Sequence, residues 1–185
     1  NFLSEESPLM GAARFPELRD LVEVDIYTQS FFYRHPEIET VILRPVHVVG
    51  PTIRNAPSDY LRLERPWTLA GFDPMVQFIH ADDVAEAIRR VLEPGVRGVF
   101  NLVGPGEVPL SAALRELGRR SIPIPHPLAR PAVGLLRRYR LTGFRGPEVD
   151  FLRYLCAVDG SRARQDWGWK PTRSMRETIR SVLGE

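Results

Sequence analysis

The sequence is short of cysteine, of lysine and of long apolar runs, and each shortage excludes a class of protein. Cys156 is the only cysteine among 185 residues, so no disulfide can form within the chain, and a reducing compartment suits it. The longest uncharged stretches, such as residues 45–53, fall well below the roughly 20 apolar residues that a membrane helix needs. Residues 1–6 are acidic where a secretory signal would be basic. We therefore expect a cytoplasmic protein that does not span a membrane.

The net positive charge is small. Arginine carries almost all of the cationic charge, since Lys170 is the only lysine. The formal net charge is +2. A dedicated nucleic-acid binder needs a clustered basic face, so no nucleic-acid partner is expected. No His-x-x-x-His or Cys-x-x-Cys pattern occurs, and we expect no metal site. The four histidines are His35, His47, His80 and His126.

The stretch from Pro16 to Arg34 predicts a helix. Pro16 suits the first turn, and the carboxylates of Glu17 and Asp20 suit the positive end of the helix dipole. His35-Pro36 then ends it. This helix is also our candidate surface for a homodimer. Its expected apolar face is broad and comprises Leu18, Leu21, Val22, Ile26, Phe31 and Phe32.

A strand, a helix and a second strand follow in that order. Residues 40–49 are rich in β-branched side chains and nearly apolar on both sides, which is typical of a parallel strand buried on both faces. Residues 82–93 predict a helix capped by Asp82 or Asp83. Residues 98–103 predict another buried strand. This order favours an α/β fold with a parallel sheet.

The remaining segments are less regular. Residues 52–74 predict a loop-rich insert, and residues 121–131 predict an extended connector because prolines alternate with apolar residues. Ser111 is the expected cap of one helix, and Ser174 and Glu177 have the spacing of a capping box in another. These and two further helices are expected at residues 111–119, 132–139, 147–157 and 174–183.

Three segments carry a resemblance to a known family. Residues 43–51 (LRPVHVVGP) form an apolar strand that runs into a Gly-Pro turn. Residues 78–84 (FIHADDV) form a strand whose last polar residues lead into a helix, and residues 167–171 (WGWKP) form an aromatic turn before the closing helix. In this order they resemble the carboxyl-terminal part of an extended short-chain dehydrogenase/reductase, the NAD-dependent epimerase/dehydratase family.

The resemblance implies a partial Rossmann-like parallel sheet with a small mixed substrate-binding subdomain. Residues 14–50 and 80–106 would supply the Rossmann-type elements, and residues 51–79 and 107–185 mainly the substrate subdomain. The glycine-rich half that binds the dinucleotide would precede Asn1, so we expect the chain to be the carboxyl-terminal part of a longer protein and inactive alone. The implied cofactor is NAD or NADP, and the implied partner is a small-molecule substrate.

The resemblance also assigns residues to a site. In the family, the backbone matching Pro45, Val46, His47 and Val48 passes the nicotinamide ring, and the residue matching His47 faces the substrate. His47 would therefore contact substrate or handle a proton, because imidazole titrates near neutral pH; the alternative is a histidine hydrogen-bonded within the strand end. Asn55 and His80 are further candidates for substrate contact.

The family's catalytic pair is missing. Active members carry a tyrosine and, four residues later on the same helix face, a lysine that lowers the phenol pKa. One alignment places Glu17 and Leu21 at these positions, and a shift of two residues places Phe15 and Arg19 there. Glu17 is our candidate substitute base if burial raises its pKa; the alternative is an ordinary acidic residue of a first helical turn.

Two functions remain open. The first is an NAD(P)-dependent epimerase, dehydratase or reductase that acts on a small organic substrate with a non-standard acid/base group. The second is a non-catalytic dinucleotide-binding protein that serves as a sensor or scaffold. Relatives that act on nucleotide sugars often carry a phosphate-gripping arginine where this chain has Val76, which weakens the case for a nucleotide-sugar substrate.

Overall fold

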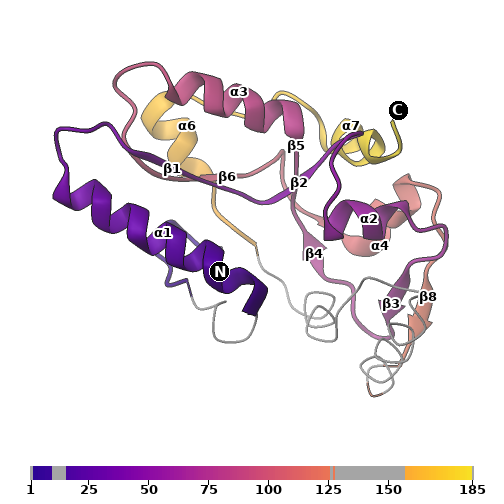
Figure 1. Cartoon of the computed structure of the whole chain (residues 1–185). Coiled ribbons are helices and arrows are strands. Elements are labelled where there is room, and N and C mark those ends of the chain that lie inside the picture. The colour runs from indigo at the N-terminus through magenta and orange to yellow at the C-terminus, as the bar shows by residue number, and fades with distance from the viewer. Residues whose placement is uncertain (1, 10–15, 126, 128–156, 185) are drawn as a thin grey trace.

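Two parallel strands position the candidate site. In the computed structural model, which describes residues 2–9, 16–125, 127 and 157–184, β1 (Val41–Pro45) pairs in parallel with β6 (Gly98–Leu102). Helix α1 (Pro16–Arg34) lies on one face of these strands. Helices α3 (Ala81–Val91) and α6 (Ser161–Trp167) cover the other face (Figure 1). The α/β fold class with a parallel sheet is confirmed.

The single strand predicted over residues 40–49 is divided in two. The β1–β6 ladder ends with the Pro45–Leu102 pair, and the chain bends at Val46, whose N–H donates to the Leu102 carbonyl oxygen at 3.0 Å. Beyond the bend, β2 (His47–Val49) pairs in parallel with β5 (Phe78–His80) instead of with β6. The strand therefore changes partner just before the residues predicted to face the substrate.

The predicted aspartate cap of α3 is wrong. The capping residue is His80, whose Nδ1 accepts a hydrogen bond from the N–H of Asp82 at 3.1 Å. Asp83 is 3% exposed and binds the other end of the chain, accepting hydrogen bonds from the Thr172 N–H at 2.9 Å and the Thr172 hydroxyl at 2.7 Å. Its carboxylate thus fixes the turn that follows Trp169 onto the start of α3.

The expected loop-rich insert contains regular structure. Helix α2 (Ala56–Arg62) and β3 (Trp67–Leu69) lie within it, and β3 pairs in parallel with β8 (Ile122–Ile124) from the expected connector. Strand β4 (Met75–Val76) pairs antiparallel with β7 (Val108–Pro109). Together these short elements form a second layer of structure beside the β1–β6 pair (Figure 1).

The two later helices begin differently from one another. Helix α4 (Leu110–Glu116) starts one residue before the predicted cap, and Ser111 instead donates from its N–H and hydroxyl to the carboxylate of Asp73, at 2.9 and 2.6 Å. Helix α7 (Met175–Arg180) has the predicted capping box and ends in a short 3₁₀ turn (Ser181–Leu183). Of the helices expected at residues 132–139 and 147–157, all residues except Ala157 lie outside the described part, as does Cys156, and Ala157 is not helical.

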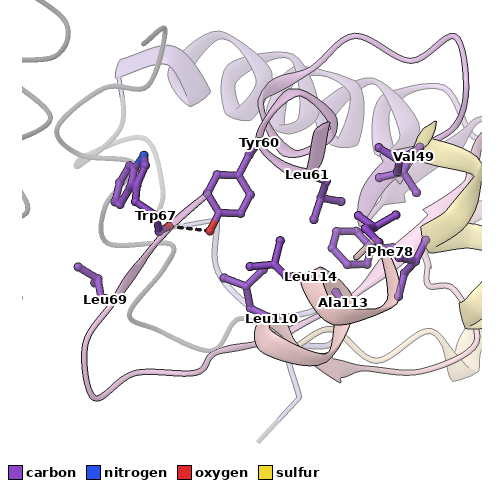
Figure 2. Packing of buried hydrophobic residues seen from close by; sticks show 12 residues of the cluster. Val49, Tyr60, Leu61, Trp67, Leu69, Phe78, Leu110, Ala113 and Leu114 are labelled. Carbon is purple, nitrogen blue, oxygen red and sulfur yellow. Dashed lines mark hydrogen bonds between the residues drawn. The ribbon is translucent and has the colours of Figure 1, made fainter. Parts of the chain in front are cut away.

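The buried side chains form two clusters. One lies among α2, α4, β3 and α7, and in it the Tyr60 hydroxyl donates to the Trp67 carbonyl oxygen at 2.7 Å (Figure 2). Burial raises the pKa of Tyr60 well above its usual value. The other cluster covers the β1–β6 pair, and there Trp169 is 2% exposed and its ring stacks on Trp167. Its buried members are Ile79, Ala87, Phe100, Leu102, Ala163 and Trp169.

Helix α1 is held to β1 by an ion pair. The Arg44 guanidinium donates to both carboxylate oxygens of Asp25, at 2.7 and 2.8 Å, and the two side chains are 16% and 14% exposed. These hydrogen bonds hold the pKa of Asp25 below its usual value. The predicted apolar face is only partly buried, because Leu21 and Ile26 are 67% and 56% exposed. A homodimer through this helix stays a prediction.

The position of Asp25 and Arg44 predicts a large loss of stability on removal of the cation. Arg44→Met should lower the free energy of unfolding by roughly 2–3 kcal/mol, because it leaves a largely buried carboxylate unpaired. Arg89→Met is the matched control, since Arg89 pairs with Glu86 on the exposed surface of α3 and should change stability little. Urea unfolding measures both variants, and equal losses would contradict the prediction.

Candidate functional site

The residues predicted to contact the cofactor lie where β1 ends and β2 begins. Pro45 and His47 are exposed. Val46 and Val48 are half-buried and pack against the buried cluster that covers the β1–β6 pair. Alternate residues of a strand point to opposite sides, and the exposure of residues 45–48 shows that this alternation continues through the bend. Ligands of open α/β sheets bind beyond the carboxyl ends of the strands. Pro45 and His47 are therefore the two side chains of this set that are open to a ligand.

His47 combines exposure with a shifted pKa. Its ring centre lies 6.3 Å from that of Phe78 on the neighbouring strand β5. The side chain is exposed at one side, yet protein atoms crowd around the imidazole and partial desolvation lowers its pKa below the usual value. At neutral pH the ring is uncharged, and one of its nitrogens can accept a hydrogen bond.

Asn55 fixes the loop that follows β2. Its Nδ2 donates to the Val48 carbonyl oxygen at 2.8 Å, and its Oδ1 accepts from the Ser58 N–H at 2.9 Å. The side chain therefore caps α2 and ties that helix to β2. Asn55 followed by Pro57 in the first turn is a recognisable signal of a helix start, within residues that were predicted to be loop. A contact between Asn55 and the substrate stays a prediction, and the second N–H of the Asn55 amide would make it.

His80 is adjacent to β2 but is buried. It pairs with Val49 across the β2–β5 ladder and is 5% exposed. Its Nδ1 caps α3 and lies 3.4 Å from a carboxylate oxygen of Asp82, which in turn binds Arg173 at 2.8 Å. These contacts give His80 a structural role, and a substrate contact through its Nε2 stays a prediction.

Glu17 lies in the first turn of α1. Because α1 and β1 are joined by a short turn and run in opposite directions, the first turn of α1 lies toward the carboxyl end of the strand (Figure 1). The side chain of Glu17 and all of Phe15 lie outside the described residues. Arg19 is exposed. The structure thus leaves both alignments of the missing Tyr/Lys pair open.

Arg62 was not singled out as a site residue, yet its guanidinium organises the loop after β2. It donates to the carbonyl oxygens of Gly50, Ile53 and Val182, at 3.0, 2.9 and 3.1 Å. Val182 is 120 residues away in the sequence. No local pattern could reveal such a contact. The loop bordering the strand ends is thereby tied to the last turn of the chain.

Three further observations concern the described residues. Among them, no group of three His, Cys, Asp or Glu side chains could hold a metal ion. No helix in the part of the chain that the structure covers is both long enough and apolar enough to cross a membrane. Val76, at the position where a phosphate-binding arginine was considered, is half-buried in β4 and packs against the cluster that contains Phe78.

Solved structures share this arrangement. The dTDP-glucose 4,6-dehydratase (rfbB) of Bacillus anthracis, in complex with NAD, matches with a TM-score of 0.70 at 14% identity, over 100% of this chain and 55% of that one. The UDP-glucuronic acid 4-epimerase of Bacillus cereus, in complex with NAD, matches with a TM-score of 0.64 at 15% identity, over 100% and 55%. The fold is of the Rossmann type.

The sequence comparisons are less specific. No family model matches the chain. The "Uncharacterized protein Rv0501" of Mycobacterium tuberculosis is 29% identical over 153 residues, which are 83% of this chain and 41% of the relative. "Uncharacterized protein Rv2047c" of the same organism is 29% identical over 145 residues, 77% of this chain and 16% of the relative. The chain thus spans less than half the length of these curated relatives.

The surroundings of His47 predict a low titration midpoint. In the folded protein its pKa should lie below the ordinary value of 6.5, because desolvation disfavours the imidazolium. The folded state then binds this proton less readily than the unfolded chain, so stability falls as the pH drops through the unfolded-state pKa. NMR titration of the ring measures the midpoint, with the urea-unfolded protein as control. Equal midpoints in the two states would contradict the prediction.

Proposed function

We propose that the whole protein binds NAD or NADP and acts as an epimerase, dehydratase or reductase on a small organic substrate. The observation that carries this proposal is the alignment of the entire chain, at a TM-score of 0.70, with a dehydratase solved with NAD. The exposure of Pro45 and His47 at the strand ends supports it as well, because a nicotinamide ring and its substrate would approach there.

The described residues offer a surface for the nicotinamide end of a dinucleotide only. Residues 45–48 offer a strand end with an apolar inner side and an exposed outer side, which suits a flat ring. A bound NAD(P) would supply the hydride acceptor or donor. His47, uncharged at neutral pH, would hydrogen-bond a hydroxyl or carbonyl group of the substrate, and Asn55 and Arg62 would hold the loop that borders it.

Glu17 is the proposed base. A carboxylate at the start of a helix is normally stabilised in its charged form, so it accepts a proton effectively near neutral pH only where burial raises its pKa. Packing against a nucleotide-binding half, which the resemblance places before Asn1, would provide that burial. On this proposal the Glu17 carboxylate would accept the proton of the substrate hydroxyl, and a bound NAD⁺ or NADP⁺ would supply the hydride acceptor.

The alternative is a non-catalytic dinucleotide-binding protein that acts as a sensor or scaffold. The observation favouring it is that neither alignment of the α1 start supplies a phenol or a lysine. The sole lysine, Lys170, is exposed in the turn before α7 and lies far along the chain. A retained fold with replaced acid/base residues is the expected result when binding persists and chemistry is lost.

Cofactor binding is the first test. Calorimetry with the whole protein should detect NAD(H) or NADP(H), because both candidate functions require it. The 185-residue chain alone serves as the control and should bind neither with measurable affinity, since the resemblance places the phosphate-binding loop before Asn1. An absence of binding by the whole protein to all four forms would contradict both functions.

Turnover separates the two functions. The cofactor-loaded whole protein is incubated with sugars, sterols and aldehydes while nicotinamide absorbance is followed. Glu17→Gln should lower kcat by about 100-fold or more, the usual contribution of a general base. Glu23→Gln, an exposed carboxylate farther along the same helix, is the matched control and should leave kcat unchanged. Unchanged turnover in Glu17→Gln removes Glu17 as the base, and no turnover across the panel favours the sensor or scaffold.

A further inference from the structure

A cavity of about 420 Å³ opens between two segments that the proposed reaction does not use. One wall is the turn after β6, residues 103–107, and the other is residues 158–161, which lead into α6. Gln77 and Trp169 also line it, and both are almost fully buried. Its volume lies within the range of small-molecule sites, roughly 300–1,000 Å³. None of the predicted cofactor or substrate residues contributes to it.

Both walls are held in place by contacts with the strands. The Gln77 side chain donates to the Val158 carbonyl oxygen at 3.1 Å and accepts from the Val158 N–H at 2.8 Å, as a neighbouring strand would. Asn101 of β6 donates to the carbonyl oxygen of Asp159 at 3.0 Å. On the other wall, a Cβ at Gly104 would overlap the carbonyl oxygen of Phe78, so this turn lies directly on β5. A cavity with fixed walls loses little entropy on binding.

The charged side chains of the cavity are not paired with one another. Arg164, Glu107 and Asp159 all line it, and no ion pair joins the guanidinium to either carboxylate. The Arg164 guanidinium makes no hydrogen bond or ion pair within the described part of the chain, whereas the nearby Arg162 guanidinium binds both Glu6 and Asp166. Opposite charges that share a cavity without meeting leave room for a ligand between them.

The chemistry of these groups selects a class of ligand. A guanidinium binds a carboxylate through two parallel hydrogen bonds, and carboxylates accept hydrogen bonds from hydroxyl or ammonium groups. Trp169 and Pro105 add apolar surface for a short carbon skeleton. We propose that this cavity is a second ligand site, which binds a small carboxylic acid bearing hydroxyl or ammonium groups. The ligand's carboxylate lies on Arg164, and its donor groups lie on Glu107 and Asp159.

Tryptophan fluorescence tests the proposal, because Trp169 lines the cavity. The whole protein is titrated with gluconate, a hydroxy acid, and with L-leucine, an amino acid, in the presence and absence of saturating NAD. At least one probe should give a saturable change that NAD leaves in place. Tighter binding of gluconate identifies a sugar acid as the ligand source, and tighter binding of leucine identifies an amino acid. Arg164→Gln should weaken binding of the better probe by about tenfold or more.

Arg65→Gln is the matched control, since Arg65 is an exposed arginine outside the cavity and its loss should leave binding unchanged. Circular dichroism during thermal unfolding establishes that both variants fold. The proposal is overturned by the absence of a saturable change with either probe, by unchanged binding in Arg164→Gln, or by complete displacement of the probe by NAD. Because the NAD titration is scored separately, failure of this site and failure of the proposed cofactor site are distinguishable.

Discussion

The contacts of Arg44 constrain the whole β1–β6 layer. Its guanidinium binds the Asp25 carboxylate from α1 and the carbonyl oxygen of Glu5, at 2.9 Å, from the amino-terminal segment. The Glu5 carboxylate in turn accepts the N–H of Asn101 in β6 at 2.8 Å. One cation in a mainly apolar strand thus joins four segments. Since the pair is largely screened from water, its geometry sets how α1 lies on the sheet. The contact therefore helps to fix α1 against β1.

The change of strand partner after Pro45 is the second constraint. The β1–β6 ladder ends at Pro45, the chain bends at Val46, and β2 then pairs with β5. That change of partner brings the end of β2 next to the start of α3, where the His80 side chain caps the helix. Asn55 closes the arrangement from the other side by binding Val48. The candidate site is therefore a product of a strand that switches neighbours, with its loop held by Arg62.

The sequence allowed prediction of those parts of the fold that depend on local or periodic signals. Buried apolar runs predicted β6 and the one strand that is divided into β1 and β2, and the Ser174 capping box was visible because both partners lie within one helical turn. The cap of α3 was mistaken because aspartate is the stronger capping residue in general, whereas His80 occupies the position and Asp83 is drawn to Thr172, 89 residues away. β8 was missed because Pro123 argues against a strand and its partner β3 lies far along the chain. For the candidate site, the strand end was predictable, but the outward side chains and the Arg62 contacts depend on tertiary structure.

The lowered pKa of His47 limits the task that this residue could perform in the proposed reaction. Desolvation that lowers the pKa of His47 keeps the ring neutral and able to accept a hydrogen bond, but the same shift makes it a weaker base. It is therefore better suited to orienting a substrate hydroxyl than to removing its proton. A base must come from a group whose pKa rises when the site closes, and a carboxylate transferred from water into a covered cleft behaves in that way. On the proposal above, Glu17, in the first turn of the helix that Arg44 holds against β1, would be the carboxylate that undergoes this change.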